Sequence, residues 1–149
     1  MIWHRPIGLF AGLSVMLAGG AGAQEAGGSP RLALELNRLE QVEASCRLTF
    51  LAQNQLGHDL DQVVLEAVLF DRNDRVERLS LLDLQSLPQA GQRVRQFDLA
   101  GLACADLGAV LINGVSACVA PDLQGSGIGE ACAQGLELSS RVETVEMHQ

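Results

Sequence analysis

The sequence predicts an all-β domain, a β-sandwich of about seven short strands. Several segments alternate apolar with polar residues, as half-buried strands do. Turn-forming residues recur about every ten positions, a spacing typical of sandwiches rather than of helical domains. Within the stretch 63–76, the residues up to Phe70 are apolar on both sides of an extended strand. We expect this strand to lie at the centre of a sheet and to be covered on both faces.

The N-terminal segment 1–23 predicts a secretory signal peptide. His4 and Arg5 form a short basic region, an apolar run covers 7–18, and small residues at 21–23 provide a cleavage site. The run is shorter than the ~20 residues that span a bilayer as a helix, so we favour cleavage over a retained anchor. It contains no Arg-Arg pair, which favours the general secretory route and a periplasmic location.

About 126 residues remain after cleavage, the size of one domain. Gly and Ala are frequent in a flexible lead-in over 24–30, and the sandwich domain covers 31–149. Alternating leucines within 32–36 predict a first strand with one buried face, and the polar segment 39–44 predicts a connection. The segment 45–54 alternates more regularly and predicts a half-buried strand with its cysteine turned inward.

The middle of the chain predicts a hairpin around the central strand. Turn chemistry over 54–59 precedes the strand, and the polar residues 71–74 form a tight connection after it. The segment 75–84 has a weaker apolar pattern, carried by Val76, Leu79 and Leu81. A helical turn over 81–87 is the alternative for the end of this segment.

The last part of the chain alternates breaks with strands. In order, the sequence predicts a break at 88–91, an edge strand over 92–99, a short helical turn within 102–108, an apolar strand over 109–118, a Gly-rich loop over 121–129, and a last strand over 136–143 before an acidic tail.

Composition disfavours several classes of ligand. Beyond residue 23 the chain has nine arginines, no lysine and eighteen acidic residues, a formal charge near −9 that repels nucleic acids and anionic lipids. Its only aromatic residues are Phe50, Phe70 and Phe97, which we expect in the core. Binders of sugars and single-stranded nucleic acids usually need exposed aromatic side chains, so both classes are unfavourable here.

The four cysteines predict two disulfides. Cys46, Cys104, Cys118 and Cys132 all lie in the exported part, and an even number in an oxidising compartment favours disulfides over a metal site. Sequence alone permits three pairings, of which we favour Cys118 with Cys132 and Cys46 with Cys104. The shorter bridge would remove about 3 kcal/mol of unfolded-state entropy and the longer about 4 kcal/mol.

Two sets of short motifs resemble known groups of exported proteins. Phe50-Leu-Ala-Gln-Asn54, Gly57, the strand 63–70 with Asp71 and Val76, and Pro88-Gln-Ala-Gly91 resemble the small immunoglobulin-like domains of the FxLYD type. Residues 34–37, Cys46, 69–71, 97–99, 102–104 and 139–141 are similar to a group of uncharacterised periplasmic proteins of α-proteobacteria. The resemblance implies an immunoglobulin-like β-sandwich in the envelope and brings no activity. Asp74 stands where related domains usually place Gly.

Histidines, serines and acids form no recognisable catalytic pattern. A Ser-His-Asp site would need His58 beside Asp59 or Asp61 and within reach of Ser45 or Ser116. We interpret His58 as a solvated loop residue. Oxidised cysteines are not nucleophiles, and the sequence has no Cys-x-x-Cys pair. We therefore predict a protein that is not an enzyme and assign no catalytic residue.

Three further patterns resemble ligand sites, and we give each a structural interpretation. The segment 125–129 (Gly-Ser-Gly-Ile-Gly) has no lysine and does not open a predicted helix, as a phosphate-binding loop would. Asp71, Asn73 and Asp74 lack the spacing of a calcium loop and predict a plain turn. The segment 147–148 (Met-His) is close to the C-terminus and is interpreted as tail rather than as a soft-metal site. We assign no cofactor and no metal ligand.

Five arginines are the candidate interface. They are Arg72, Arg75 and Arg78 around the predicted hairpin, and Arg93 and Arg95 in the next strand. If these strands are neighbours, the arginines form one face of an otherwise acidic protein, and arginine is frequent at interfaces. The alternative is cross-strand pairing with Glu66, Glu77 and Asp98 on a solvated face.

The predicted function is a non-catalytic periplasmic module that binds a protein or acts as an accessory subunit in the envelope. Binding would use a sheet edge or the arginine-bearing face. A free binding module and a subunit of a membrane-associated assembly are both compatible with the sequence. The rival hypothesis is a small-metal carrier or a hydrolase of the periplasm.

Overall fold

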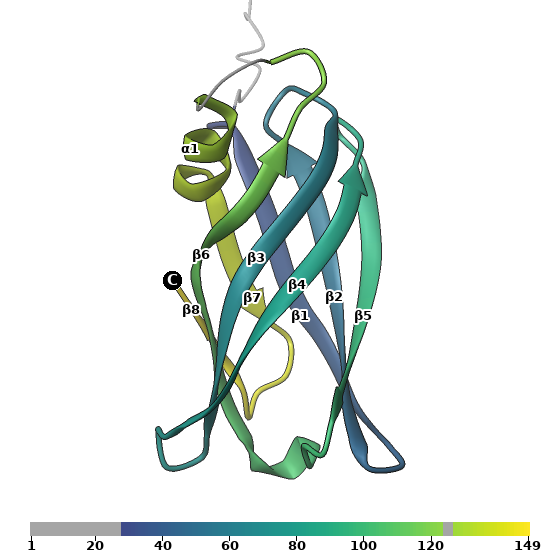
Figure 1. Ribbon diagram of the computed structural model, residues 1–149, viewed down its shortest axis with the longest axis vertical. Coiled ribbons are helices and arrows are strands. Elements are labelled where there is room, and N and C mark those ends of the chain that lie inside the picture. The colour runs from purple at the N-terminus through teal and green to yellow at the C-terminus, as the bar shows by residue number, and fades with distance from the viewer. Residues whose placement is uncertain (1–27, 124–126) are drawn as a thin grey trace, which may run out of the picture.

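A computed structural model describes residues 28–123 and 127–149 and confirms the predicted disulfide-stapled all-β sandwich. Two four-stranded sheets pack face to face in an elongated molecule, with one short helix at one end (Figure 1). The predicted signal peptide and the first residues of the lead-in lie outside the described residues, as does the segment 124–126 of the Gly-rich loop. Residues 28–30 of the lead-in have no regular secondary structure.

Eight strands form the two sheets. Sheet A has the order β5 (Gln92–Ala100), β2 (Ser45–Gln55), β1 (Arg31–Val42) and β7 (Leu136–Ser140). Sheet B has the order β4 (Val76–Leu87), β3 (Leu60–Asp71), β6 (Leu107–Val119) and β8 (Glu146–His148). The central strand predicted from its two apolar sides is β3, which pairs with both β4 and β6.

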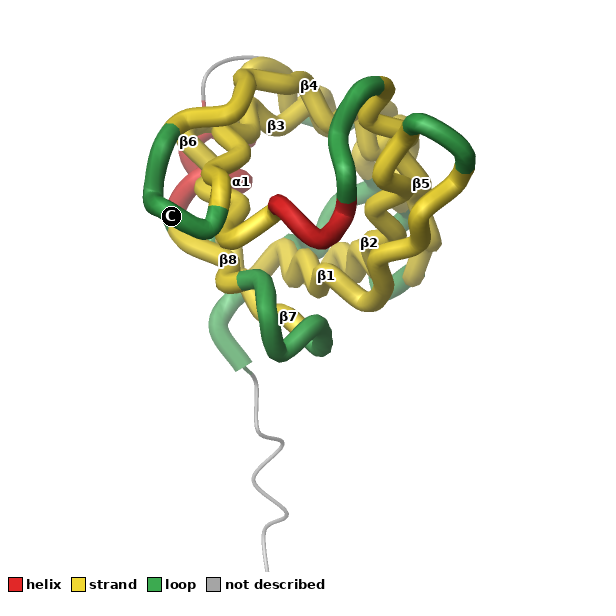
Figure 2. Tube along the Cα trace, turned by 90° about the horizontal axis from the view of Figure 1, so that it is seen from below, coloured by secondary structure: helices red, strands yellow, loops and turns green. Residues whose placement is uncertain are grey.

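The first six strands follow an immunoglobulin-like plan. β1, β2 and β5 face β3 and β6, as strands A, B and E face C and F in immunoglobulin domains. β7 and β8 depart from that plan, because β7 runs parallel to β1 and β8 runs parallel to β6. Seen along the sandwich, β7 and β8 lie together on one side, and β4 and β5 lie next to each other on the other (Figure 2).

The core forms from the side chains that alternate inward along these strands. The leucines of 32–36 and the inward residues of 45–54 are buried, as predicted. Phe50 is fully buried and meets Phe97 edge-on, with ring centroids 6.0 Å apart. Val63, Leu65 and Leu69 of β3 complete the core from sheet B.

Several boundaries agree with the sequence predictions. The turns at 54–59, 71–74 and 88–91 are present, β5 is an edge strand, the short helical turn is η1 (Cys104–Asp106), and the predicted strand 109–118 is β6. The predicted last strand is shorter than expected, because β7 ends at Ser140.

The predicted connection over 39–44 is wrong. β1 continues through this segment to Val42 and stays paired with β2, and only Glu43 and Ala44 form the turn. A register shift between Leu36 and Arg38 accommodates the change from the apolar to the polar half. Backbone pairing needs no apolar side chains, so a polar segment can prolong a ladder that its partner strand already holds.

The alternative of a helical turn over 81–87 is also wrong, because β4 extends to Leu87. The side chains that enter the core are Leu82, Leu84 and Leu87, whose uneven spacing comes from a bulge. Gln85 has a φ of 58° there, and its backbone N–H donates to Asp83 Oδ1 at 2.8 Å. A bulge adds one residue to a strand. The buried positions are then separated by two residues before the bulge and by three across it, which resembles the spacing of a helix.

Two elements near the C-terminus were not predicted. Helix α1 (Gly127–Gln134) begins inside the predicted Gly-rich loop, so the statement that 125–129 opens no helix is wrong. Ile128 and Cys132 lie one turn apart and bury the inner side of this helix. β8 lies in the predicted tail and pairs with β6.

Both favoured disulfides are present. Cys46 of β2 is bonded to Cys104 of η1, and Cys118 of β6 is bonded to Cys132 of α1. The second bridge attaches α1, which is too short to be stable alone, to the end of sheet B. Disulfides of this kind form and persist in oxidising compartments.

Candidate functional site

The outer face of β3 is where a sequence prediction fails most informatively. Val64, Val68 and Phe70 point away from the core, and no element in the described part of the chain covers them. The prediction that both faces of this strand are covered is therefore wrong for the outer face. Val68 is largely shielded, and its cross-strand neighbours are Leu79 and Leu111.

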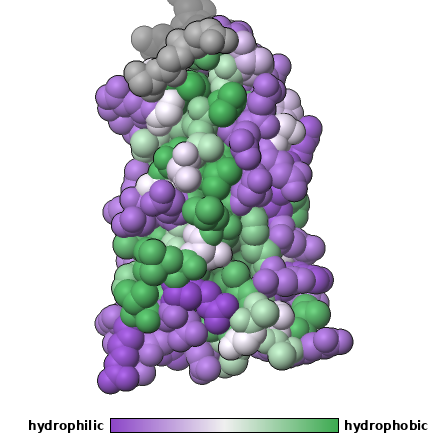
Figure 3. Space-filling model, in the orientation of Figure 1, coloured by the Kyte–Doolittle hydropathy of each residue, from purple (hydrophilic) through white to green (hydrophobic). Residues whose placement is uncertain are grey.

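These residues belong to a larger apolar surface on sheet B, which we call the outer patch. It consists of Val64, Val68 and Phe70 of β3, Val76, Leu79 and Leu81 of β4, and Ala109 and Leu111 of β6. Figure 3 shows hydrophobic surface running along this face of the molecule. Antiparallel sheets normally turn polar residues to solvent, so this apolar outer face departs from the usual pattern.

The β4 side of the patch is the most exposed. Leu79, Leu81 and Val76 have 73%, 61% and 57% of their surfaces accessible to solvent. These are the residues that carried the weak apolar pattern of the sequence, and none of them enters the core. Their exposure gives the outer patch a side that a partner can reach without any rearrangement of the fold.

One acidic residue lies within the outer patch. Glu66 is exposed at the middle of β3, opposite Leu81 on one neighbouring strand and Gly114 on the other. A side chain at Gly114 would place its Cβ 3.5 Å from Glu66 Oε2, so the glycine leaves one flank of the carboxylate open. Within the described residues, Glu66 forms no ion pair.

Acidic groups also border the patch. Asp83 is exposed opposite Val64 on β4. On β8, Glu146 lies opposite Ala109, and its Oε2 is 3.2 Å from His148 Nε2. Negative charge therefore borders the patch at Asp83 and Glu146, and Arg75 lies next to Val76 at its turn end.

The structure gives two of the candidate arginines a different position from the one expected. Arg78 and Arg95 lie opposite the core residues Leu69 and Phe50, so both point inward from the edge strands β4 and β5. They span the gap between the two edges and hydrogen-bond to the backbone of the opposite sheet.

Each of the two arginines donates to backbone carbonyls. Arg95 donates from Nε to Leu84 O at 2.7 Å and from Nη2 to Ser86 O at 3.1 Å. Arg78 donates from Nη1 to Ala100 O at 2.9 Å. Inward-pointing charges on edge strands are a known device against edge-to-edge aggregation. These arginines close the β4–β5 side of the sandwich.

The other three candidate arginines are not gathered into one face. Arg72 donates from Nε to Ala105 O near η1, and Arg93 donates from Nη1 to Gln92 O at 2.8 Å. Arg75 is exposed in the β3–β4 turn. The five residues are thus divided between the turn and the β4–β5 side.

The alternative of cross-strand pairing holds for none of the candidate arginines among the described residues. Arg78 Nη2 lies 3.5 Å from Glu77 Oε1, but these two residues are neighbours along the same strand. Asp98 is instead held by Arg47, which donates two hydrogen bonds of 2.6 and 2.7 Å to the carboxylate. These bonds lower the pKa of Asp98.

His58 has a carboxylate partner that the sequence did not suggest. Its Nδ1 is 2.8 Å from Asp122 Oδ2, and this hydrogen bond lowers the pKa of Asp122. Asp59 instead accepts a hydrogen bond from the backbone N–H of Gln89. Ser45 begins β2, at the opposite end of that strand from the His58 loop, so this serine and His58 do not come together.

The carboxylate of Asp71 stabilises the β3–β4 turn. Its Oδ1 accepts hydrogen bonds from the backbone N–H groups of Arg75 and Asn73, and these bonds lower the pKa of Asp71. Asp74 takes a φ of 59°, the left-handed conformation that the glycine of the resembling domains would adopt without strain. The interpretation of this segment as a turn is confirmed.

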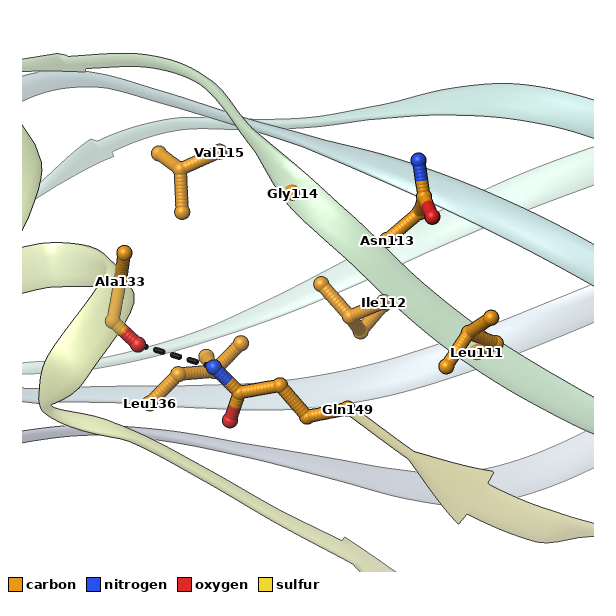
Figure 4. Close-up of a pocket in the computed structure, with 8 residues that line it drawn as sticks. All are labelled: Leu111, Ile112, Asn113, Gly114, Val115, Ala133, Leu136 and Gln149. Atoms are coloured by element: carbon orange, nitrogen blue, oxygen red, sulfur yellow. Dashed lines mark hydrogen bonds between the residues drawn. The ribbon is translucent and has the colours of Figure 1, made fainter.

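A small cavity lies beside β6, beyond the end of β8. It has a volume of about 250 Å³ and is lined mainly by apolar groups of β6, α1 and β7. Gln149 reaches across it and donates from Nε2 to Ala133 O at 2.9 Å (Figure 4). Asn113 and Gln149 are the only polar side chains in its lining, so the cavity offers no group for acid–base or nucleophilic chemistry.

The described residues contain neither a membrane-spanning helix nor a cluster of metal-ligating side chains. None of the helices in residues 28–123 and 127–149 is long and apolar enough to cross a membrane. The same part of the chain contains no cluster of three or more His, Cys, Asp or Glu residues arranged to hold a metal ion.

Comparisons with known proteins identify no relative. No model of a protein family matches the chain, and no curated protein or solved structure matches it at a significant level. The resemblance to FxLYD-type domains and to the α-proteobacterial group therefore stays a prediction.

Sequence reasoning missed the outer patch, although the signal was present. The two apolar sides of β3 were interpreted as double coverage, and an uncovered apolar face gives the same pattern. Leu79 and Leu81 lie on the same side of the sheet as the outer residues of β3. This follows from the pairing of β3 with β4, which the sequence of either strand alone does not give.

Proposed function

We propose that the protein is a non-catalytic periplasmic binding or accessory module that docks a protein partner on the outer patch. The observation that carries this proposal is the exposed apolar surface on sheet B. Exposure of an apolar sheet face to water is unfavourable in free energy. A partner that covers the face removes this apolar surface from water and is therefore bound favourably.

Other features support the location and the mode of binding. The predicted signal peptide and the two disulfides fit an exported protein. At the β4–β5 side, Arg95 already occupies two backbone carbonyls that an added strand would use. This favours docking on the sheet face over docking at that edge.

The test compares envelope proteins retained by the purified protein and by a Leu79→Ser/Leu81→Ser variant. Both leucines are exposed, so the variant should keep the stability of the wild type. A matched control, Val94→Ser on β5, removes an apolar side chain of similar exposure (58%) from the other sheet.

We expect the wild type and the control to retain the same partner from a native envelope extract in mild detergent. The patch variant should retain it about tenfold more weakly or not at all, equivalent to at least about 1.4 kcal/mol. Equal retention by all three proteins, or a monodisperse monomer without a partner, would contradict the proposal. Co-purification with a membrane complex would identify the subunit alternative over the free module.

A further inference from the structure

Glu66 is the one charged side chain that the structure places within the outer patch. Along β3 it lies between Val64 and Val68, which face the same side of the sheet. Across the sheet its neighbours are Leu81 and Gly114. A carboxylate in this position lies in the part of the surface that any partner covering the patch must also cover.

Among the described residues, no hydrogen bond or ion pair uses this carboxylate. Cross-strand positions are where opposite charges pair in sheets, yet both positions beside Glu66 are occupied by non-polar residues. Gly114 leaves open the flank on which a larger residue would contact Oε2. The carboxylate is thus accessible from the side as well as from above.

A covered carboxylate needs a partner charge. Burying an unpaired carboxylate under an apolar surface is costly, whereas a cation that donates hydrogen bonds to it removes most of that cost. Such a pair contributes more to selectivity than to affinity, because partners without the cation are rejected.

The charge of the molecule selects the kind of partner. The full chain carries a formal charge of −8, and Asp83 and Glu146 border the patch. A second copy related by a two-fold axis at the patch centre would bring two Glu66 carboxylates together, and an anionic lipid surface would be repelled. A polypeptide with apolar and basic residues complements both the apolar surface of the patch and the negative charge of Glu66.

We infer that the docking segment of the partner is an apolar polypeptide stretch that places an arginine or lysine on Glu66. This inference rests on the proposed function of the outer patch and specifies the chemistry of its partner. The apolar residues of the segment cover Val68, Leu79 and Leu81, and the cation enters the open flank at Gly114.

The test uses two acetylated nine-residue peptides that alternate valine with threonine. One carries a central arginine and the other a central glutamate. The protein is titrated with each peptide by isothermal calorimetry as wild type, Glu66→Gln and Glu66→Arg, with Glu137→Gln on β7 as a control for loss of one exposed acid from the other sheet. Thermal unfolding of each variant verifies that the fold is intact.

We expect the wild type and the Glu137→Gln control to bind the arginine peptide at least about tenfold more tightly than the glutamate peptide. Glu66→Gln should abolish this preference, and Glu66→Arg should reverse it. The preference of the wild type should decrease with added salt.

Three outcomes of the titration overturn the inference. They are equal binding of both peptides by the wild type, absence of binding to either peptide, and a preference that persists in Glu66→Gln. Binding to vesicles of phosphatidylcholine and phosphatidylglycerol, or a dimer that depends on Leu79 and Leu81, also overturns it by identifying another occupant. The retention experiment with Leu79→Ser/Leu81→Ser decides the proposed function separately, because it does not depend on Glu66.

Discussion

Asn54 is the one buried polar side chain among the described residues with no exposed surface, and all its hydrogen-bonding groups are used. Its Nδ2 donates to His58 O and to Leu87 O, both at 2.8 Å. Its Oδ1 accepts from the backbone N–H of Leu56 at 3.0 Å. The amide therefore joins the end of β2, the following loop and the end of β4.

Replacing Asn54 with leucine should destabilise the protein by about 3 kcal/mol. Leucine has the same branching but is bulkier, and two carbonyls and one N–H would lose their partners. Urea unfolding at neutral pH measures the effect, and Asn113→Leu at an exposed bulge is the control, expected within about 0.5 kcal/mol of wild type. A loss below about 1 kcal/mol for Asn54→Leu would show that the amide is not needed to join these segments.

Residue types predicted some local structure correctly and some only in part. Asp71 and Asn73 predicted a turn, because short polar side chains bond to nearby backbone groups whatever the rest of the fold does. His58 was correctly placed in a loop, but its partner Asp122 lies 64 positions away in the sequence. A contact of that separation follows from the tertiary fold and has no local signal.

Among the elements, the two edge strands β4 and β5 depend on each other. Arg95 of β5 bonds two carbonyls of β4, and Arg78 of β4 bonds a carbonyl of β5. The arginines therefore tie the open side of the sandwich and occupy backbone groups that another strand would otherwise pair with.

Arg95→Ala should lower the free energy of unfolding by about 2 kcal/mol, because hydrogen bonds from a charged donor are among the stronger ones. It should also increase self-association of the protein at high concentration, since Leu84 O and Ser86 O become available to pair with another copy at the edge. Arg93→Ala, on the same strand and bonded only to its neighbour Gln92, is the control. Urea unfolding and sedimentation velocity measure the two effects. An Arg95→Ala variant as stable and as monomeric as Arg93→Ala would rule out this function of Arg95.

Element prediction succeeded where alternation was regular and failed where bulges or pairing changed it. β2 and the first half of β1 were predicted by their alternating residues. β4 was ambiguous because the bulge at Gln85 gives its buried leucines an uneven spacing. α1 and β8 are too short for a periodic signal, and they are held by Cys132 and by pairing with β6.

At the scale of the whole molecule, the two disulfides link parts that the sheets alone do not join. Cys46–Cys104 spans 58 positions and connects β2 to η1, whereas Cys118–Cys132 spans 14 and connects β6 to α1. The difference in loop length predicts a difference in their contributions to stability.

Replacing both cysteines of a bridge with serine should cost about 4 kcal/mol for Cys46–Cys104 and about 3 kcal/mol for Cys118–Cys132. Loss of the first should destabilise the whole sandwich, and loss of the second should loosen α1 in particular. Urea unfolding and amide hydrogen exchange separate these effects. Non-reducing peptide mapping of the wild type checks the pairing, and a Cys46–Cys118 link would contradict it.

The sequence by itself determined the all-β class, the central strand, most turns and the presence of two disulfides. These features depend on local periodicity, on turn chemistry and on the number and spacing of cysteines. Tertiary structure decided which face of β3 is covered, where the arginines point and which residues share the outer patch. A strand apolar on both sides is compatible with either a second covering layer or an open binding face. Only the packing of neighbouring elements distinguishes these two cases, because the pattern within one strand is the same in both.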